Sequence, residues 1–149
     1  MTSVNPPVPD HGIALLDTAF SRFRDDLLTE IAEADLPPHM EGLRGAQIRL
    51  LQLTPPEGMR ATDLAARAGT TKQALGELAA QLEASGHLES VRDPADRRVR
   101  IWRRTAQGSE AAKLAGELVA VVEGRWRRHL GAAEWSAFRA TLLRIRDEL

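Results

Sequence analysis

An arginine-rich segment marks the second half of the chain. Between Val91 and Arg104 there are six arginines and two aspartates, although the net charge of the 149-residue chain is −1. Guanidinium groups form paired hydrogen bonds with phosphate oxygens and with guanine. The turn sequence Asp93-Pro94-Ala95-Asp96, with alternating polar and apolar residues beside it, predicts a β-hairpin over 87–104. Arginines at the tip of such a hairpin can enter a DNA minor groove, where negative potential is concentrated.

Two interpretations of these arginines are open. As DNA contacts they would need orientation, and Asp96 could hold the guanidinium of Arg98 in a fixed direction. As the solvated face of an edge strand they would only prevent aggregation. Trp102 falls on the same side of the strand as Arg98 and Arg100, where a tryptophan more often covers the hairpin than reads a base. The candidate residues of this segment are Arg92, Asp96, Arg97, Arg98 and Arg100.

The helix predicted over 71–85 carries a second candidate surface. The face opposite its leucines is mostly small, because Gly76, Ala80 and Ala84 lie there. A surface that enters a major groove about 12 Å wide needs few bulky side chains. Glutamine can pair with adenine, and lysine can contact guanine or phosphate. The candidate contacts on this helix are Thr71, Lys72, Gln73 and Gly76.

Polar residues of this helix also allow structural interpretations. Thr70 could be the N-cap of a capping box, with the Gln73 side chain reaching back to its amide. Lys72 could simply be solvated, as lysines on helix faces usually are. Glu77 could accept a hydrogen bond from cytosine, tune binding by repulsion, or pair with a neighbouring arginine.

The elements that position these residues follow the order of a winged helix-turn-helix. Apolar residues spaced by three and four predict helices over 11–35, 41–53, 61–68, 71–85, 106–130 and 133–148. Short helix, turn, longer helix and hairpin (the wing) make a DNA-binding unit over 58–108, which favours the DNA interpretation of the arginines. The expected fold class is mainly α with a small β-hairpin wing, flanked by dimerisation helices within 11–57 and 109–149. Residues 1–10, with three prolines, are predicted to form a disordered arm.

Apolar stripes on the long terminal helices predict a partner subunit. Little else in the chain is available to cover them, so a homodimer is expected. Phe20, Phe23 and Leu51, the last on the 41–53 helix, could instead line a ligand pocket. An aromatic stripe at helical spacing is, however, more often dimer core.

Composition argues against several other classes. The absence of cysteine excludes a disulfide framework, a thiolate metal site and a cysteine redox sensor. No apolar run approaches the roughly 20 residues of a membrane span and no signal peptide is visible, so a cytoplasmic protein is expected. The four histidines lack metal-ligand spacing, and no phosphate loop or nucleophile motif is present. No metal, cofactor or enzymatic activity is therefore expected, and His87 is interpreted as an exposed hairpin residue.

Several short segments resemble the MarR family of transcription regulators. The resemblance extends over about 41–149, and its wing motif is fairly specific because motif and expected structure agree. The run Thr71–Leu78 is similar to a subset of the family with a TKQ-type recognition helix. The matching segments are Asp63-Leu64-Ala65, Leu82-Glu83-Ala84-Ser85-Gly86, Asp93-Pro94-Ala95-Asp96-Arg97-Arg98 and Thr105-Ala106-Gln107-Gly108.

The resemblance implies a homodimer that binds a pseudo-palindromic operator in double-stranded DNA. Many members repress transcription and are released by a small aromatic or anionic effector. By the same resemblance Arg98 would enter the minor groove, with Asp96 as its orienting partner. Alternative functions are a winged-helix protein-interaction module and a ligand-binding protein without DNA-binding activity.

The chain departs from the family pattern at three places. Arg104 stands where leucine is usual, and Arg60 replaces the usual capping hydroxyl before the first helix of the helix-turn-helix. Gly76-Glu77 replaces the threonine and arginine of many members. Base-reading assignments from those members therefore do not transfer to this chain.

Overall fold

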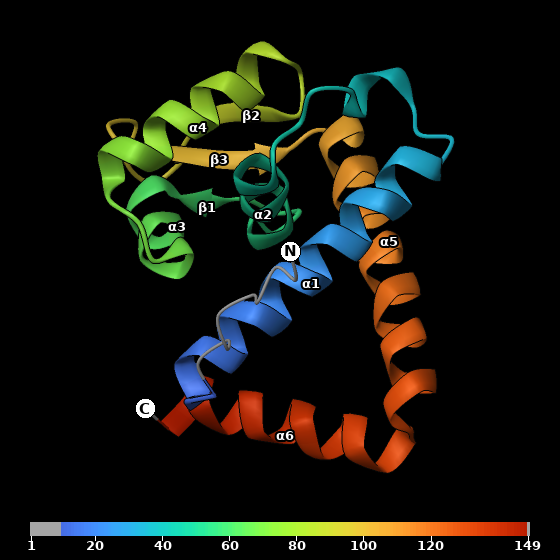
Figure 1. Cartoon of the computed structure of the whole chain (residues 1–149). Coiled ribbons are helices and arrows are strands. Elements are labelled where there is room, and N and C mark those ends of the chain that lie inside the picture. The colour runs from blue at the N-terminus through green and yellow to red at the C-terminus, as the bar shows by residue number, and fades with distance from the viewer. Residues whose placement is uncertain (1–9, 149) are drawn as a thin grey trace, which may run out of the picture. The chain divides into compact units, whose positions relative to one another are not determined.

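The computed structural model describes residues 10–148, which confirm the expected mainly α fold with a small β-hairpin wing (Figure 1). The predicted arm lies outside the described residues except for Asp10. The helices are α1 (Gly12–Glu33), α2 (Gly45–Leu53), α3 (Ala61–Ala68), α4 (Lys72–Ala84), α5 (Ala106–Leu130) and α6 (Ala132–Glu148), with a 3₁₀ turn η1 (Pro38–Met40). The strands are β1 (Met59–Arg60), β2 (Leu88–Arg92) and β3 (Arg100–Arg104).

The chain forms two compact units. The unit Asp35–Glu117 contains η1, α2, α3, α4, the sheet and the first part of α5. The other unit combines the chain up to Ala34 with the chain from Leu118 onward, and so contains α1, the rest of α5 and α6. Helix α2, grouped with the N-terminal helices from the sequence, thus shares a unit with the helix-turn-helix.

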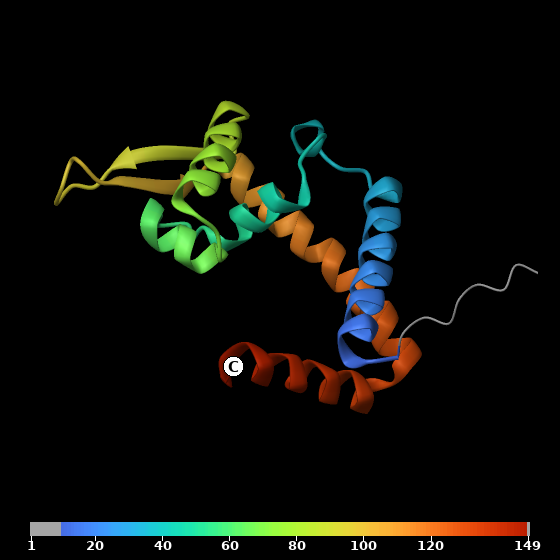
Figure 2. The ribbon, with the colours of Figure 1, turned by 60° about the vertical axis from the view of Figure 1, so that its left-hand side comes forward.

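The sheet is antiparallel, with strand order β1-β3-β2. Five residue pairs join β2 to β3, from Leu88 opposite Arg104 to Arg92 opposite Arg100. The period-two pattern did not predict β1, which is only two residues long and pairs with Trp102 and Ile101. Figure 2 shows β2 and β3 as a ribbon that extends well beyond α3 and α4.

Leucines from four elements fill the core of the Asp35–Glu117 unit. Burying one leucine side chain contributes about 2 kcal/mol of hydrophobic stabilisation. Trp102 on β3 is also a core residue, since only 2% of it is exposed. The helical leucine faces and the first hairpin strand therefore converge on one core, which holds the helix-turn-helix against the sheet. The leucines that are at most 2% exposed are Leu51, Leu64, Leu75, Leu82 and Leu88.

The turn between α3 and α4 corrects the expected capping box. Gly69, with φ +64°, ends α3, and the Thr70 amide donates to the Ala65 carbonyl oxygen at 3.1 Å. Thr70 therefore belongs to the end of α3 and does not cap α4. Thr71 is the N-cap of α4, and its Oγ1 accepts a hydrogen bond from the Ala74 amide at 3.1 Å.

Helix α2 begins at Gly45 rather than at residue 41. The preceding 3₁₀ turn ends at Met40, and Gly42 takes φ +78°, which interrupts a continuous helix. Gln47 then fixes the start, because its Oε1 accepts a hydrogen bond from the Arg44 amide at 2.9 Å.

Aromatic rings link the helices of the other unit. Phe23 on α1 and Trp126 on α5 meet edge to face at 5.5 Å between ring centroids, and Trp126 lies 6.5 Å from Trp135 on α6. The indole Nε1 of Trp126 donates to Asp26 at 2.8 Å. Together these contacts tie α1, α5 and α6 into one packed group of helices.

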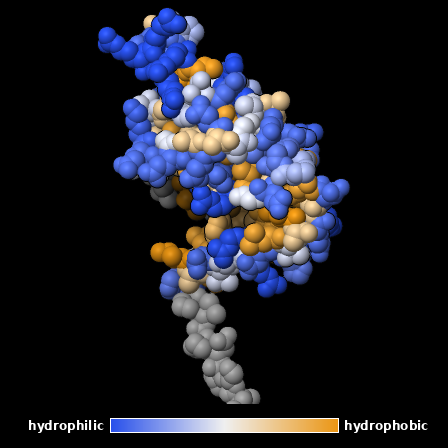
Figure 3. Space-filling model, turned by 90° about the horizontal axis from the view of Figure 1, so that it is seen from above, coloured by the Kyte–Doolittle hydropathy of each residue, from blue (hydrophilic) through white to orange (hydrophobic). Residues whose placement is uncertain are grey.

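Many large apolar side chains of α1 and α6 are nevertheless exposed. Figure 3 shows apolar patches on an otherwise largely hydrophilic face of the molecule. No helix in the described part of the chain has both the length and the apolar character needed to cross a membrane. The exposed apolar residues of these two helices are Ile13, Leu15, Leu16, Phe20, Leu28, Ile31, Phe138, Leu142, Leu143 and Ile145.

Candidate nucleic-acid interface

The tip of the wing is a braced turn between β2 and β3. The Asp93 amide donates to the Val99 carbonyl oxygen at 3.0 Å, and the Val99 amide donates to the Asp96 carbonyl oxygen at 2.9 Å. Asp96 Oδ1 accepts a hydrogen bond from the backbone amide of Arg98 at 3.0 Å. The hydrogen bond that the structure describes for Asp96 is thus to the Arg98 backbone and not to its guanidinium, and this bond shapes the turn. The orienting role of Asp96 toward the Arg98 side chain stays a prediction.

The predicted wing arginines are exposed on this hairpin. The structure brings Arg97 and Arg98 together in the turn and places Arg92 and Arg100 opposite each other at its base. The Arg100 guanidinium carbon lies 5.0 Å from the centroid of the Trp102 ring, a cation–π contact that restricts its direction. Arg103, by contrast, is engaged in an ion pair with Glu89 at 2.8 Å. The hairpin thus presents a concentrated positive charge at its tip and base.

The start of α4 presents the second predicted surface. Thr71, Lys72 and Gln73 are exposed. A Cβ added to Gly76 would meet no atom within 4 Å, so open space lies in front of this part of the helix. Gln73 Nε2 donates to Glu77 Oε1 at 3.4 Å, a long hydrogen bond between two exposed side chains. The outer face of α4 is therefore small and polar, as a groove-reading helix requires.

Arg60 is a residue of this region that the sequence reasoning did not assign to the site. Its guanidinium makes an ion pair with Asp93 at the base of the wing turn, with Nη2 2.7 Å and Nε 3.2 Å from Oδ2. Hydrogen bonds from the Ala95 amide and from Arg60 lower the pKa of Asp93. The departure from the family pattern at Arg60 was the available signal, but 33 residues separate it from its partner.

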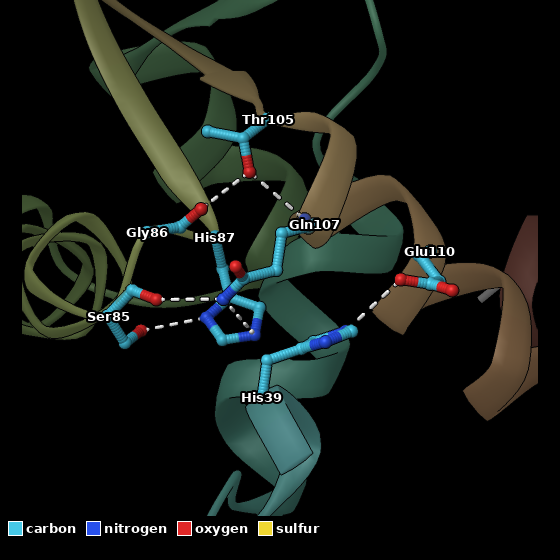
Figure 4. Close-up of polar contacts among 8 residues, drawn as sticks. His39, Ser85, Gly86, His87, Thr105, Gln107 and Glu110 are labelled. Atoms are coloured by element: carbon cyan, nitrogen blue, oxygen red, sulfur yellow. Dashed lines mark hydrogen bonds and ion pairs between the residues drawn. The ribbon is translucent and has the colours of Figure 1, made fainter. Parts of the chain in front are cut away.

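A cluster of polar side chains surrounds the buried His87 at the C-terminal end of α4 (Figure 4). His87 is 1% exposed, so its interpretation as an exposed hairpin residue was wrong. Its Nδ1 lies 2.8 Å from Ser85 Oγ at the end of α4, and its ring centroid lies 5.5 Å from that of His39 on η1. His39 Nε2 in turn lies 3.5 Å from Glu110 Oε2 on α5. The residue is buried because it closes the corner where α4, β2 and α5 meet.

The His87 cluster predicts a pH-dependent stability. Burial, followed by the neighbouring His39, lowers the pKa of His87 below its ordinary 6.5. The unfolded chain therefore takes up a proton first as the pH falls, and the folded state loses stability. The free energy of unfolding should have its full value above about pH 6.5 and decrease below it. Urea unfolding between about pH 7.5 and about pH 5.5 measures this slope.

One variant isolates the contribution of His87. His87→Gln should flatten part of the slope, because the titrating group is removed while a polar side chain remains. Equal slopes for the wild type and His87→Gln would contradict the assignment.

No group of three or more possible metal ligands occurs in this cluster or elsewhere in residues 10–148.

The residues suggested for a ligand pocket have different environments. Phe20 and Phe23 line a mostly apolar cavity of about 240 Å³ together with Trp126, Trp135 and other residues of the same unit. Leu51 is 0% exposed in the core of the Asp35–Glu117 unit, so its side chain offers no surface to a ligand. A second cavity, of about 400 Å³, is lined by Arg22, Asp26, Arg125, Trp126, His129 and Leu130.

A packed helix-turn-helix, a basic wing and an exposed recognition helix define a winged helix-turn-helix protein. Residues 41–99 match the MarR family. The transcriptional repressor CouR bound to a 23-mer DNA duplex is 28% identical, with a TM-score of 0.75 over 92% of this chain and 93% of that chain. CouR of Rhodococcus jostii RHA1 bound to p-coumaroyl-CoA is 22% identical, with a TM-score of 0.74 over 97% of this chain and 98% of that one.

A further similar structure is BpsR of Bordetella bronchiseptica, whose DNA binding is regulated by 6-hydroxynicotinic acid. It is 20% identical, with a TM-score of 0.75 over 94% of this chain and 96% of that one. No curated protein matches the chain. The winged-helix fold of these regulators therefore extends over nearly the whole chain, and the family match is confined to α2 through the wing.

Proposed function

We propose that this chain is a transcription regulator that binds double-stranded DNA as a homodimer and acts as a repressor released by a small-molecule effector. The observation that carries the proposal is the joint exposure, on one compact unit, of the start of α4 and of the wing arginines. Helix α4 would enter the major groove and the wing the neighbouring minor groove. The residues we assign to DNA binding are Thr71, Lys72, Gln73, Gly76, Arg92, Arg97, Arg98 and Arg100, with Asp96 shaping the turn.

Two similarities support this proposal. The match to the MarR family covers the α2-to-wing segment, and CouR, with the same fold, has been solved on a DNA duplex. Within the family pattern we place α4 in the TKQ-type subset and take 58–108 as the DNA-binding unit. For a regulator of this kind we propose a cytoplasmic location.

The flanking helices support a homodimer. Large apolar residues of α1 and α6 are exposed, among them Ile13 (79%), Phe20 (67%) and Leu142 (40%). Apolar patches of this kind usually mark interaction surfaces. Two recognition helices related by a two-fold axis would then read a pseudo-palindromic operator, with half-sites about one helical turn apart.

The effector is proposed to be a small aromatic or anionic molecule. BpsR responds to 6-hydroxynicotinic acid, and CouR binds p-coumaroyl-CoA. In this chain the cavity lined by Phe20 and Phe23 is mostly apolar, and the one lined by Arg22 and Arg125 also carries positive charge. These two cavities, rather than a site at Leu51, are where we propose that an effector binds.

A salt titration on selected DNA tests the proposed function. Duplexes enriched by the wild-type protein from fragments of its source genome provide the probe, and fluorescence anisotropy gives the dissociation constant. If about six phosphates are neutralised, the slope of log affinity against log salt should be about −5, because bound phosphates release their counterions. A flat slope, or no enrichment of any duplex, would contradict the proposal.

The alternative function is a winged-helix module that binds a protein, or a ligand, without using its DNA face. The exposed apolar surface of α1 and α6 fits that reading as well as a homodimer. A protein that forms a stable dimer but enriches no duplex would favour this alternative.

A further inference from the structure

The ion pair between Arg60 and Asp93 joins two elements that the proposed DNA interface uses separately. Arg60 is the last residue of β1 and directly precedes α3, the first helix of the helix-turn-helix. Asp93 directly follows β2 and begins the wing turn. Both hydrogen bonds from the guanidinium go to Oδ2 of Asp93, at 2.7 Å and 3.2 Å.

The other carboxylate oxygen of Asp93 holds the turn itself. Oδ1 accepts a hydrogen bond from the Ala95 amide at 2.9 Å, while the Asp93 amide donates to the Val99 carbonyl oxygen. The Asp93 side chain is 10% exposed, whereas the Arg60 side chain is 51% exposed. One carboxylate thus links Arg60, the residue before α3, with the Ala95 amide inside the wing turn.

We propose that Arg60 is a positioning residue for the wing, which fixes the direction in which the turn carrying Arg97 and Arg98 leaves the sheet. The proposal rests on the proposed DNA binding. Arg60 acts through Asp93 and not by touching DNA, because both of its short contacts are directed at that carboxylate. Its contribution to folding is smaller than that of a fully buried pair, since half of the Arg60 side chain is exposed and water screens its charge.

The structure gives a physical reason why the wing needs such a contact. The five β2–β3 residue pairs end at Arg92 and Arg100, and β1 pairs only with Ile101 and Trp102. Beyond Arg92 and Arg100, the described backbone contacts of the turn are those within the turn itself, between Asp93, Asp96 and Val99. The ion pair of the Arg60 side chain with Asp93 joins this turn to the residue that precedes α3.

A double-mutant cycle tests the proposal. The probe is a genomic duplex selected by the wild-type protein, and the variants are Arg60→Met, Arg98→Ala and the two combined. Arg60→Met should weaken binding about tenfold in the wild-type background and less than about twofold in the Arg98→Ala background, because residues that act through one another are not additive. Arg60→Lys should restore most of the affinity. Urea unfolding of Arg60→Met should show that the variant is fully folded under the conditions of the binding measurement.

Arg139→Met is the matched control. Arg139 forms an ion pair with Glu123 at 2.9 Å, and its side chain is 51% exposed like that of Arg60. It lies in the unit without the wing, so the control should bind DNA like the wild type. Asp93→Asn, which keeps an oxygen for the Ala95 amide but loses the charge, should reproduce the effect of Arg60→Met.

The outcomes separate this inference from the proposed function. If the wild type selects no duplex, or Arg98→Ala has no effect on binding, the proposed DNA binding by the wing fails. If both behave as expected but Arg60→Met binds like the wild type, the positioning role fails alone. If the loss of binding free energy caused by Arg60→Met adds fully to that caused by Arg98→Ala, Arg60 acts independently of Arg98, as a direct DNA contact would. This result also overturns the positioning role.

Discussion

Replacing Arg97 and Arg98 together by glutamate is expected to abolish specific binding to duplex DNA while leaving the fold intact. Both side chains are exposed in the wing turn. The backbone of this turn is fixed by hydrogen bonds from the Ala95 amide to Asp93 and from the Arg98 amide to Asp96. The substitution removes two positive charges and places two negative ones against phosphate. We expect a loss of at least about a thousandfold in affinity, equivalent to about 4 kcal/mol. Anisotropy titration with a selected genomic duplex measures it.

A charge-matched control distinguishes local contact from a general electrostatic effect. Arg24→Glu combined with Lys113→Glu changes the net charge by the same amount on α1 and α5, where both side chains are more than half exposed. This control should lose only the small, salt-sensitive part of the affinity that comes from long-range attraction. Size-exclusion chromatography should show the same oligomeric state for both variants. Binding that survives in the wing variant would remove the wing from the DNA interface.

Replacing Gly108 by alanine is expected to destabilise the fold by about 3 kcal/mol, because core overpacking that rigid backbone cannot relieve is costly. Gly108 is in the first turn of α5, and an added Cβ would overlap the carbonyl oxygen of His87 and lie 2.9 Å from its carbonyl carbon. The helix cannot move away easily, because Thr105 Oγ1 donates to the Gly86 carbonyl oxygen at 2.6 Å (Figure 4) and accepts a hydrogen bond from the Gly108 amide at 3.1 Å. Urea unfolding measures the loss.

Gly116→Ala, on the same helix, provides the opposite result. No atom lies within 4 Å of a Cβ added there. Alanine in an exposed helix interior is favoured over glycine by about 0.5–1 kcal/mol, so this variant should be slightly more stable than the wild type. If both substitutions destabilised the protein equally, the close approach of α5 to His87 would not be the cause.

Much of the fold could be predicted from the sequence because its signals are local. The leucine spacing of 71–85, the glycine after Ala68 and the turn before Asp96 each act over a few residues, and the structure has α4, the α3 cap and the wing at those places. The same locality explains the errors. Thr70 and Thr71 are both good capping residues, and two hydrogen bonds decide between them. The Thr70 amide donates to the end of α3, and Thr71 Oγ1 accepts from the Ala74 amide.

The candidate site could be predicted only in part, for a different reason. Exposed arginines in a turn are visible in a sequence, whereas their supporting contacts join residues far apart. Arg60 meets Asp93 across 33 positions, and Gln107 meets Ser85 across 22. The burial of His87 also depends on contacts between distant residues, since α5 packs over it. The position of Trp102 in the core also followed from tertiary packing and not from the strand pattern alone.

The wing has a root, the paired strands β2 and β3, and a tip, the turn from Asp93 to Val99, and separate interactions determine the structure of each. Five strand pairs and the buried Trp102 fix the root, whereas the tip is defined by its own short hydrogen bonds and by the Arg60 contact. Lengthening a surface loop adds little closure entropy, about 0.6 kcal/mol for each doubling. Insertions and substitutions between Asp93 and Val99 can therefore accumulate without unfolding the sheet. The wing is in this sense a replaceable module, in which DNA preference can diverge among descendants of the chain while the scaffold stays the same.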